Sequence, residues 1–411
     1  MLLKQPPSYR NFLLLALFLI TNSAVSHSQN KVSGKLLDSK NAPVSNAHVF
    51  FKNDQSSGTI SNELGDFRLY VYSHHTEDTL MISILGYEIY KQPVSTLKED
   101  LVIYMEESSF DLEEVTILSD SYLKKILKEA IGKIEYNYPT QTHRLRGYYQ
   151  EYTISDTSYT EFIEADVTVE TSSYTADPIR NTYYLNALRK SDDKRNLPER
   201  LKGMRNGVHL TYNHNNLLYR SFDYLPWQSN KFQDFGKELN SDKKLILKNK
   251  QILGQDTLLT IEYEDQVFTD MVYTLITINL SNKAITKLVK GNIWDFDDDF
   301  TEIHFREING IHYPFYIKNV SQYEYNKKTE YHYSMRSLLF YEIESDQSQF
   351  KKYKRKQRMK EEKNIRDFKY QYDPEFWNSY IHSNKLSTTA IIKAELGRQR
   401  NLDEEFRQNQ R

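Results

Sequence analysis

Short runs in which apolar and polar residues alternate dominate the chain between Lys31 and Leu118. The runs are KVSGKLLD, NAPVSNAHVFFK, GTISNELGDFRLYV, TLMISILGYEIY and LVIYME, and turn-forming residues separate them. Alternation places successive side chains on opposite faces of a strand, and strands this short at this spacing are typical of an antiparallel sandwich. We therefore predict a β-sandwich over residues 29–118.

A helical pattern follows the predicted sandwich. Its apolar residues recur at steps of three and four, as on one face of a helix: Leu123, Ile126, Leu127, Ala130, Ile131 and Ile134. Ser119 can cap the start of this helix and Pro139 stops it. The pattern predicts a linking helix over residues 119–139 that packs on the next domain, and the alternative is a partner-binding helix.

Alternation returns in longer runs from His143 to Glu344, including TEFIEADVTVETS, TLITINLSNKAITKLVK and TEYHYSMRSLLFYEIE. Asn309 and Gly310 separate two such runs, and this residue pair favours a two-residue hairpin turn. We predict one large antiparallel sheet over residues 140–346, curved on itself like a half-barrel. Alternation lapses over residues 177–250, which we interpret as an insertion.

The predicted insertion contains aromatic residues in a loop-like setting: Tyr219, Phe222, Tyr224, Trp227 and Phe232. Because loops on a rigid sheet commonly carry binding residues, these five are the candidate ligand- or partner-binding residues. The alternative is that they close one end of the sheet. Residues 347–411 form a charged tail that we predict to be helical, and its basic run KKYKRKQRMKEEKNIR is typical of a solvated helix or linker.

The N-terminus has the pattern of a secretory signal peptide. Lys4 and Arg10 precede the apolar run FLLLALFLI, and the small residues Ser26 and Ser28 follow it. This run is short for a membrane-spanning helix. We expect cleavage after residue 28 and export to the periplasm or outer membrane, and the alternative is an uncleaved membrane anchor.

Composition narrows the function classes. The chain has 54 basic and 56 acidic residues, so no overall charge favours nucleic acid as a partner. Its 32 Tyr and 20 Phe residues favour a β-rich protein, because aromatic side chains suit half-buried strands. It has no cysteine, which excludes disulfides, thiolate metal sites and cysteine nucleophiles.

The order VSGKLLD, APVSNAHVFF, GTISNELGDFRL and ISILGYE resembles the carboxypeptidase regulatory-like domain, a transthyretin-like β-sandwich. The resemblance implies that Gly34 opens the first hairpin and that Ala47 packs before the second strand. It also implies that Gly65 makes the tight turn before the strand of Phe67. All of these roles are structural, and none supplies a chemical group to a substrate.

Other segments resemble envelope proteins. FDLEEVTILSD resembles the segment after this domain in TonB-dependent receptors, but the roughly 290 residues that follow are too few and too polar for a receptor barrel. YDPEFW and NLDEEF resemble the tail of uncharacterised Bacteroidetes envelope proteins that begin with the same domain and have no assigned activity. The strand order of the large domain loosely resembles periplasmic lipoprotein carriers, in which a curved sheet holds acyl chains.

The sequence contains two His-x-x-Glu pairs of the kind that zinc peptidases use, His74 with Glu77 and His304 with Glu307. The first pair lies in a predicted turn of the sandwich. The second lies on a predicted strand, where positions three apart point to opposite faces and cannot hold one ion without a bulge. We therefore predict no zinc-dependent catalysis.

Other chemical motifs are weaker. The segment DFDDD, from Asp295 to Asp299, offers carboxylates for calcium but lacks the glycine and the closing glutamate of a calcium loop, so we favour a surface turn. Serine nucleophile elbows, phosphate-binding glycine loops and dinucleotide fingerprints are absent from the sequence. We predict no catalytic residue, no cofactor and no metal ligand.

The sequence thus favours a mainly β, non-catalytic cell-envelope protein that works in binding or assembly. Its sandwich is expected to act as a docking domain whose exposed edge accepts a strand from an envelope partner. The first alternative is a periplasmic carrier of a lipid or another apolar ligand in the curved sheet. The second is a hydrolase with an unrecognised site. Peripheral association with a membrane fits the first two functions.

Overall fold

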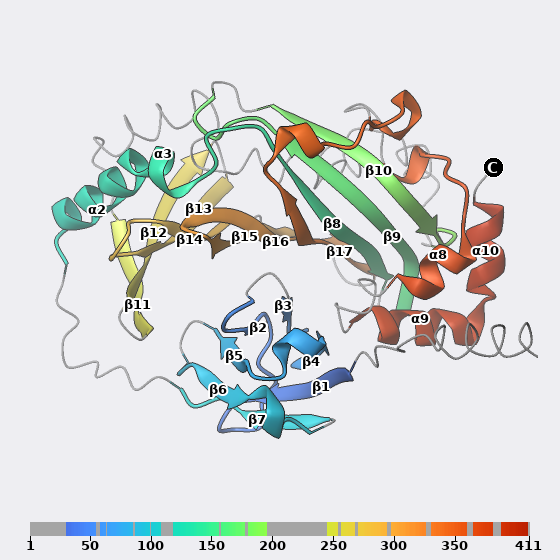
Figure 1. Cartoon of the computed structure of the whole chain (residues 1–411), viewed down its shortest axis with the longest axis horizontal. Coiled ribbons are helices and arrows are strands. Elements are labelled where there is room, and N and C mark those ends of the chain that lie inside the picture. Colours follow the sequence, from blue (N-terminus) through green and yellow to red (C-terminus); the bar gives the residue numbers. More distant parts are fainter. Residues whose placement is uncertain are drawn as a thin grey trace, which may run out of the picture.

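Figure 1 shows the computed structural model of the chain, in which a small β-sandwich lies against a large curved sheet. The structure describes residues 30–409 apart from the following gaps: 55–57, 63, 85–86, 99, 108–117, 156–157, 177–179, 195–244, 254–255, 268–269, 294–296, 326–329, 360–364 and 381–387. The predicted signal peptide, residues 1–28, lies outside the described residues.

The predicted sandwich is confirmed and consists of two sheets, with strand orders β4-β1-β7 and β3-β2-β5-β6. Its elements are β1 (Asn30–Leu37), β2 (His48–Phe51), β3 (Gly58–Ile60), β4 (Asp66–Val71), η1 (Ser73–His75), β5 (Thr79–Ser83), β6 (Tyr90–Pro93), η2 (Val94–Thr96) and β7 (Leu101–Tyr104). The pairing of β1 with β7 is parallel, so the sandwich is not antiparallel throughout as predicted. β7 reaches β1 after the chain has passed through the other sheet, and this crossover allows a parallel pair.

Glycines shape the sandwich in two different ways. Gly65 has a φ of +77° and makes the predicted turn before β4. Gly34, which the family resemblance placed at a hairpin, instead lies inside β1 opposite Phe67. A Cβ atom on Gly34 would lie 2.6 Å from the Phe67 ring, so this glycine makes room for the buried aromatic side chain.

The predicted linking helix is confirmed and is divided into α2 (Asp120–Gly132) and α3 (Ile134–Asn137). Ser119 Oγ accepts a hydrogen bond from the Tyr122 amide and caps α2. The apolar stripe of α2 is buried against the large sheet, as expected for a helix that packs on its own chain. After α3, the Tyr138 hydroxyl donates to the Ile285 carbonyl at 2.7 Å, which fixes the end of the helical segment to the sheet.

The large sheet has ten strands in the order β10-β9-β8-β17-β16-β15-β14-β13-β12-β11. Every neighbouring pair is antiparallel, and β10 and β11 remain as edges, so the sheet is curved but not closed. The strands are β8 (His143–Ser155), β9 (Ser158–Thr171), β10 (Asn181–Lys190), β11 (Leu245–Leu253), β12 (Asp256–Val267), β13 (Asp270–Asn279), β14 (Ile285–Ile293), β15 (Asp297–Ile308), β16 (Ile311–Tyr325) and β17 (Glu330–Glu344). The predicted hairpin joins β15 to β16, with φ of 53° at Asn309 and 82° at Gly310.

Strand β10 and the first six residues of β11, 245–250, fall inside the range that we interpreted as an insertion. Each pairs with its neighbour through a register shift, between Leu185 and Ala187 in β10 and between Leu247 and Asn249 in β11. A bulge breaks the period of two, which explains why the sequence pattern lapses there. The five candidate aromatic residues from Tyr219 to Phe232 lie outside the described residues.

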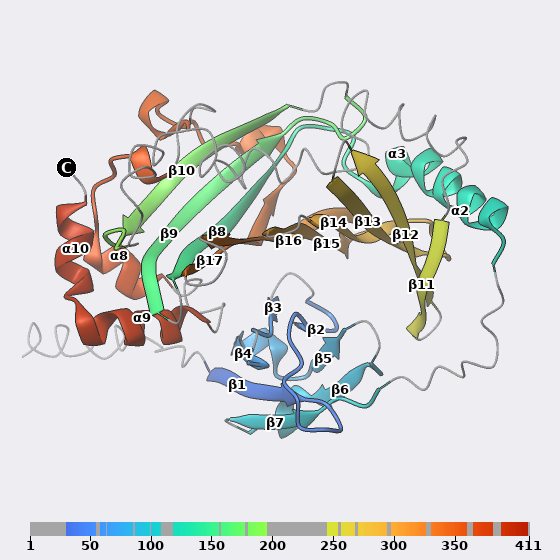
Figure 2. The ribbon, with the colours of Figure 1, turned by 180° about the vertical axis from the view of Figure 1, so that it is seen from behind.

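The two faces of the large sheet bury different partners. The α2 face packs apolar side chains against helix α2, and it includes Leu145, Ile163, Ile303 and Ile317. The sandwich face includes Tyr148, Phe162 and Phe315, and it packs against Ile60 of the sandwich and against the C-terminal helices. These helices lie at the same end of the sheet as β8–β10 in both views (Figures 1 and 2).

The C-terminal segment contains η5 (Gln347–Gln349), η6 (Arg355–Gln357), η7 (Ile365–Asp367), α8 (Pro374–Ser379), α9 (Thr388–Gln399) and α10 (Leu402–Gln408). The prediction that the basic run is solvated is wrong for Met359 and Ile365, which are buried in the core, and for Arg366. Arg366 reaches into the sheet and contacts Glu151 at 2.7 Å and Glu161 at 2.6 Å, because these two buried carboxylates need a cation. Among the described residues, none of the helices has the length and apolar character needed to cross a membrane.

Candidate ligand-binding cavity

The sandwich is joined to the sheet by specific polar contacts. Gln251 of β11 donates from Nε2 to the carbonyl oxygens of Ile84 at 3.0 Å and Tyr87 at 2.9 Å. On the other side of the interface, His48 of β2 contacts the Phe315 ring edge to face, with ring centres 4.8 Å apart. Because both ends of the sandwich make contacts, the domain has a defined position under the sheet.

A cavity of about 880 Å³ lies between these contacts. β2, β3 and β5 form its sandwich wall, and β11 to β16 form its sheet wall. Side chains with polar groups on both walls include Asn46, His48, Lys52, Thr277, Asn279 and Arg306. Neither the sandwich nor the sheet could enclose this space alone.

A hydrogen-bonded chain crosses the interface beside the cavity. Lys287 Nζ lies 2.5 Å from Glu302 Oε1, and His304 Nε2 lies 2.6 Å from the same oxygen. His304 Nδ1 in turn lies 2.7 Å from His48 Nε2. Since the carboxylate can only accept, we assign the His304 proton to Nε2, and His48 then donates from its Nε2 to His304 Nδ1.

Burial controls the protonation of the histidines and the glutamate in this hydrogen-bonded network. Burial lowers the pKa of His48 well below its ordinary value, and the nearby His304 and Arg306 lower it further. Burial also lowers the pKa of His304, although Glu302 opposes the shift. Burial alone would raise the pKa of Glu302, but His304 and Lys287 outweigh it and hold that pKa well below its ordinary value. At neutral pH, Glu302 is therefore ionised, and His48 and His304 are neutral.

Arg306 is the unusual cation of the cavity. Its guanidinium lies over the Phe315 ring, 3.8 Å from the ring centre. In the described part of the chain, no residue accepts a hydrogen bond from this guanidinium or forms an ion pair with it. Burial lowers the pKa of Arg306 to about 9, although Asp54 opposes the shift. The cation is thus half-buried, and its hydrogen-bond donors have no partner among the described residues.

The second His-x-x-Glu pair is not assembled in the structure. The register shifts at His304 and Phe305, but the extra residue is Phe315 of β16, so β15 keeps its alternation and His304 and Glu307 stay on opposite faces. His304 bonds to Glu302 and His48, whereas the Glu307 carboxylate lies 3.7 Å from His312. His304 and Glu307 therefore contact different residues and do not form a metal-binding pair.

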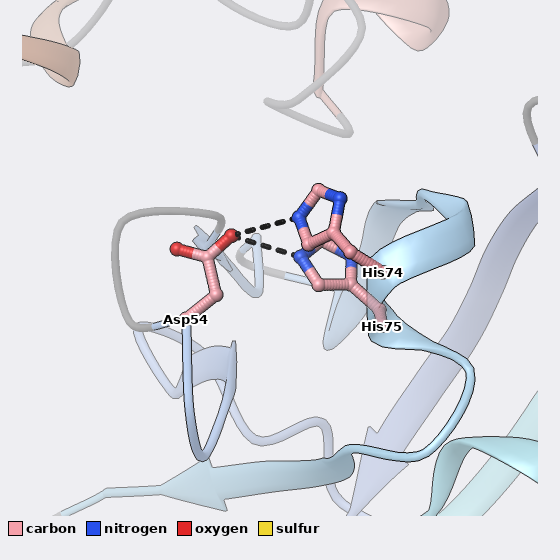
Figure 3. A group of neighbouring side chains, drawn as sticks. All are labelled: Asp54, His74 and His75. Carbon is pink, nitrogen blue, oxygen red and sulfur yellow. Dashed lines mark hydrogen bonds and ion pairs between the residues drawn. The ribbon is translucent and has the colours of Figure 1, made fainter.

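The first pair contributes to a different cluster. His74 and His75 both approach Asp54, with Nε2 to Oδ2 distances of 3.5 Å and 2.8 Å (Figure 3). Glu77 is not part of this cluster. Asp54 comes from the segment after β2, 20 or more positions away, so spacing in the sequence could not reveal it.

The tautomer of His75 decides what this cluster can do. The Tyr72 amide donates to His75 Nδ1 at 3.2 Å, so the proton of the neutral ring lies on Nε2 and is donated to Asp54. A metal ion at Nε2 needs a lone pair that this tautomer does not offer. His75 is fully buried and stacks on Phe51 at 3.9 Å. The donor set therefore suits a hydrogen-bonded anchor better than a metal site.

Only part of the DFDDD segment lies among the described residues. Asp295 lies outside the described residues, whereas Asp297, Asp298 and Asp299 begin strand β15. This position differs from the surface turn that we favoured. The backbone pairs there with Tyr323, Gln322 and Ser321 of β16.

The groups that define the cavity were not predicted from the sequence. Glu302, His304 and Arg306 alternate along β15, and this period of two is the signal that could have placed them together on one face. His48 was assigned only to a strand of the resemblance. Its proximity to His304 depends on how two domains pack and has no local signature.

Comparison with known families supports one part of the chain. Residues 32–117 match the model of the CarboxypepD_reg-like domain. The sandwich is therefore a carboxypeptidase regulatory-like domain, in agreement with the motifs found in the sequence. Comparisons with curated proteins and with solved structures gave no match to the chain.

Proposed function

We propose that the protein is a non-catalytic binding protein of the cell envelope and that its ligand occupies the cavity between the regulatory-like domain and the sheet. The observation that carries this proposal is the cavity of about 880 Å³ with walls from both domains. Its volume and its mixture of apolar and polar side chains are typical of small-molecule sites. The regulatory-like domain then acts as the second wall of a binding site.

The polar groups beside the cavity support binding more than catalysis. His48 and His304 bond to each other, and Glu302 orients His304. In the described part of the chain, no hydroxyl group hydrogen-bonds to either ring, whereas activation of a serine or threonine nucleophile requires that bond. The histidines therefore serve to hold the two walls together.

The α2 face gives less support to the apolar-carrier alternative. A carrier needs open apolar space in the curve of the sheet. The described side chains there, such as Val167, Ile278 and Leu338, are fully buried in one apolar cluster, which also includes the stripe of α2 and residues of the C-terminal segment. The cavity on the sandwich face is the better candidate for a ligand. The envelope location rests on the signal-like residues 1–28.

Assembly through strand addition is a second candidate function, carried by strand β7. β7 is an edge strand, and it lies on the side of the domain away from the large sheet (Figures 1 and 2). Val102 and Tyr104 on this strand are 60% and 57% exposed. An exposed edge with apolar side chains is suited to accept a strand from a partner protein.

Retention of small molecules tests the ligand-binding function. The purified full chain is incubated with a small-molecule extract of the native host, separated by gel filtration, and denatured so that bound compounds can be identified by mass spectrometry. The variant Ser83→Phe fills part of the cavity, and Ser121→Phe, on the exposed side of α2, is the matched control. We expect a compound that the wild type and the control retain and that Ser83→Phe loses. Retention by all three proteins, or by none, would contradict the proposal.

A further inference from the structure

We propose that Arg306 is the anchor of the cavity and that the ligand is an amphipathic monocarboxylate, whose carboxylate pairs with the guanidinium while its apolar part lies along the cavity wall. This inference rests on the proposed function and names the chemical class of its ligand.

The guanidinium of Arg306 has hydrogen-bond donors that no described residue uses. Arg306 is half-buried, and a partly desolvated cation gains free energy when an anion pairs with it. Phe315 covers one face of the guanidinium at 3.8 Å, and this cation–π contact compensates only part of the cost of desolvation. The contact leaves the N–H groups at the edge of the plane available, and their fork geometry matches a carboxylate.

The neighbourhood of Arg306 keeps space for a ligand. Gly58 of β3 approaches the guanidinium, and a Cβ atom placed on this glycine would lie 3.6 Å from Arg306 Nη1. A side chain at this position would contact the guanidinium. The absence of a side chain on Gly58 therefore leaves space beside Arg306.

The charges around the cavity limit the ligand to one negative charge. The lining includes the cations Lys52, Lys287 and Arg306, and it also includes Asp54, Asp256 and Glu307. Lys287 is already paired with Glu302 at 2.5 Å. Since the acidic groups would repel a multiply charged anion, a carboxylate fits this site better than a phosphate.

The apolar part of the lining determines the rest of the ligand. Phe50, Ile84, Leu258 and Phe315 line the same cavity as Arg306. These side chains come from both walls, so an apolar chain or ring between them would contact the sandwich and the sheet together. A small amphipathic acid satisfies both the cation and this surface.

Binding of a simple probe to the full chain tests the inference. The probe is hexanoate, the uncharged analogue is hexanamide, and inorganic phosphate tests the other anion that a guanidinium recognises. Affinities are measured by saturation-transfer NMR with the wild type, Arg306→Gln, Arg306→Lys and the control Arg180→Gln, which changes an exposed arginine outside the cavity. We expect hexanoate to bind at least tenfold more tightly than hexanamide. Arg306→Gln removes this preference, Arg306→Lys keeps part of it, and Arg180→Gln leaves it unchanged.

Several outcomes would overturn the inference. They are equal binding of acid and amide, an unchanged preference in Arg306→Gln, or binding of phosphate without hexanoate. If Arg306→Gln does not fold, the affinities of the wild type and of Arg306→Lys for hexanoate and hexanamide still test whether Arg306 binds the carboxylate. A cavity-dependent ligand from the native extract that is uncharged would contradict this inference while leaving the proposed function intact. No retained compound together with no hexanoate binding would remove both.

Discussion

His48 Nε2 and His304 Nδ1 lie 2.7 Å apart and join two residues separated by 256 positions in the chain. One belongs to the regulatory-like domain and the other to the large sheet. Because a histidine ring changes its donors when it takes up a proton, the contact between the two domains depends on pH.

We predict that the contact between the domains weakens in acid. The pKa values of His48 and His304 are lowered in the folded protein, so the released histidines bind more protons than the docked ones at pH values between the lowered pKa and about 6.5. The contact is therefore fully stable above about pH 6.5 and is lost as the pH falls below it. Hydrogen exchange of β2 between pH 8 and pH 5 measures the effect.

The control for this prediction is His48→Gln, which removes one titrating group and should flatten the profile. The cations Lys287 and Arg306 and the anion Glu302 remain in that variant, so a steep profile in His48→Gln would assign the pH dependence to other groups. A flat profile in the wild type would show that the histidine pair does not control the contact.

We predict that Phe67→Ala lowers the free energy of unfolding of the regulatory-like domain by about 3 to 5 kcal/mol, the usual cost of emptying a buried aromatic site. Phe67 is 1% exposed and lies on Gly34. The opposite change, Gly34→Ala, should also destabilise, by about 1 to 3 kcal/mol, because its Cβ would overlap the Phe67 ring. Urea unfolding checks both variants. Val102→Ala, at an exposed site, is the control and should change stability little.

The regulatory-like domain should fold without the rest of the chain. Its apolar side chains, including Val49, Phe51 and Leu80, form their own buried cluster. The fragment of residues 31–118 should show a β spectrum by circular dichroism and should melt below the full chain, because it lacks the contacts of His48 and Gln251. The fragment from residue 119 onward should keep its own β signal. Two unfolded fragments would show that the domain and the sheet share one core.

We predict that Glu151→Gln destabilises the large sheet by roughly 3 to 5 kcal/mol, since the buried Arg336 loses its carboxylate partner and Arg366 keeps only Glu161. Glu151 is 1% exposed and contacts Arg336 at 3.0 Å and Arg366 at 2.7 Å. The matched control is Glu342→Gln, because Glu342 also faces an arginine but is 46% exposed. Chemical unfolding should separate the two variants clearly. Equal losses would show that the network around Glu151 is not essential.

Export predicts a mature N-terminus near Ser28 in the native host. Mass spectrometry of the protein from a fractionated cell measures this terminus directly. An intact Met1 on protein from the cytoplasmic fraction would contradict both the envelope location and the function proposed from it.

Local patterns predicted much of the fold. The alternation of the sandwich, the stripe of α2 and the turn at Asn309 and Gly310 are signals within a few residues of each other, and all three were confirmed. Strands β10 and β11 were not predicted, because a bulge in each breaks the alternation of apolar and polar residues. The cavity between the sandwich and the sheet was not predicted for another reason. His48 and Arg306 acquire their roles only when the sandwich packs on the sheet, and packing between domains leaves no spacing in the sequence.

The pairing of β8 with β17 has a consequence for how this protein is made. β8 is the first strand of the large sheet in chain order and β17 is the last, yet they lie side by side near its middle. The N-terminal part of a chain emerges first during synthesis, so β8 to β10 and β11 to β16 wait as two separate pieces with open edges. The last strand then joins them through contacts of high sequence separation, which makes this closure a slow step. A chain that ends before β17 should therefore yield two unjoined pieces of sheet that are prone to aggregate, and not a smaller version of the same protein.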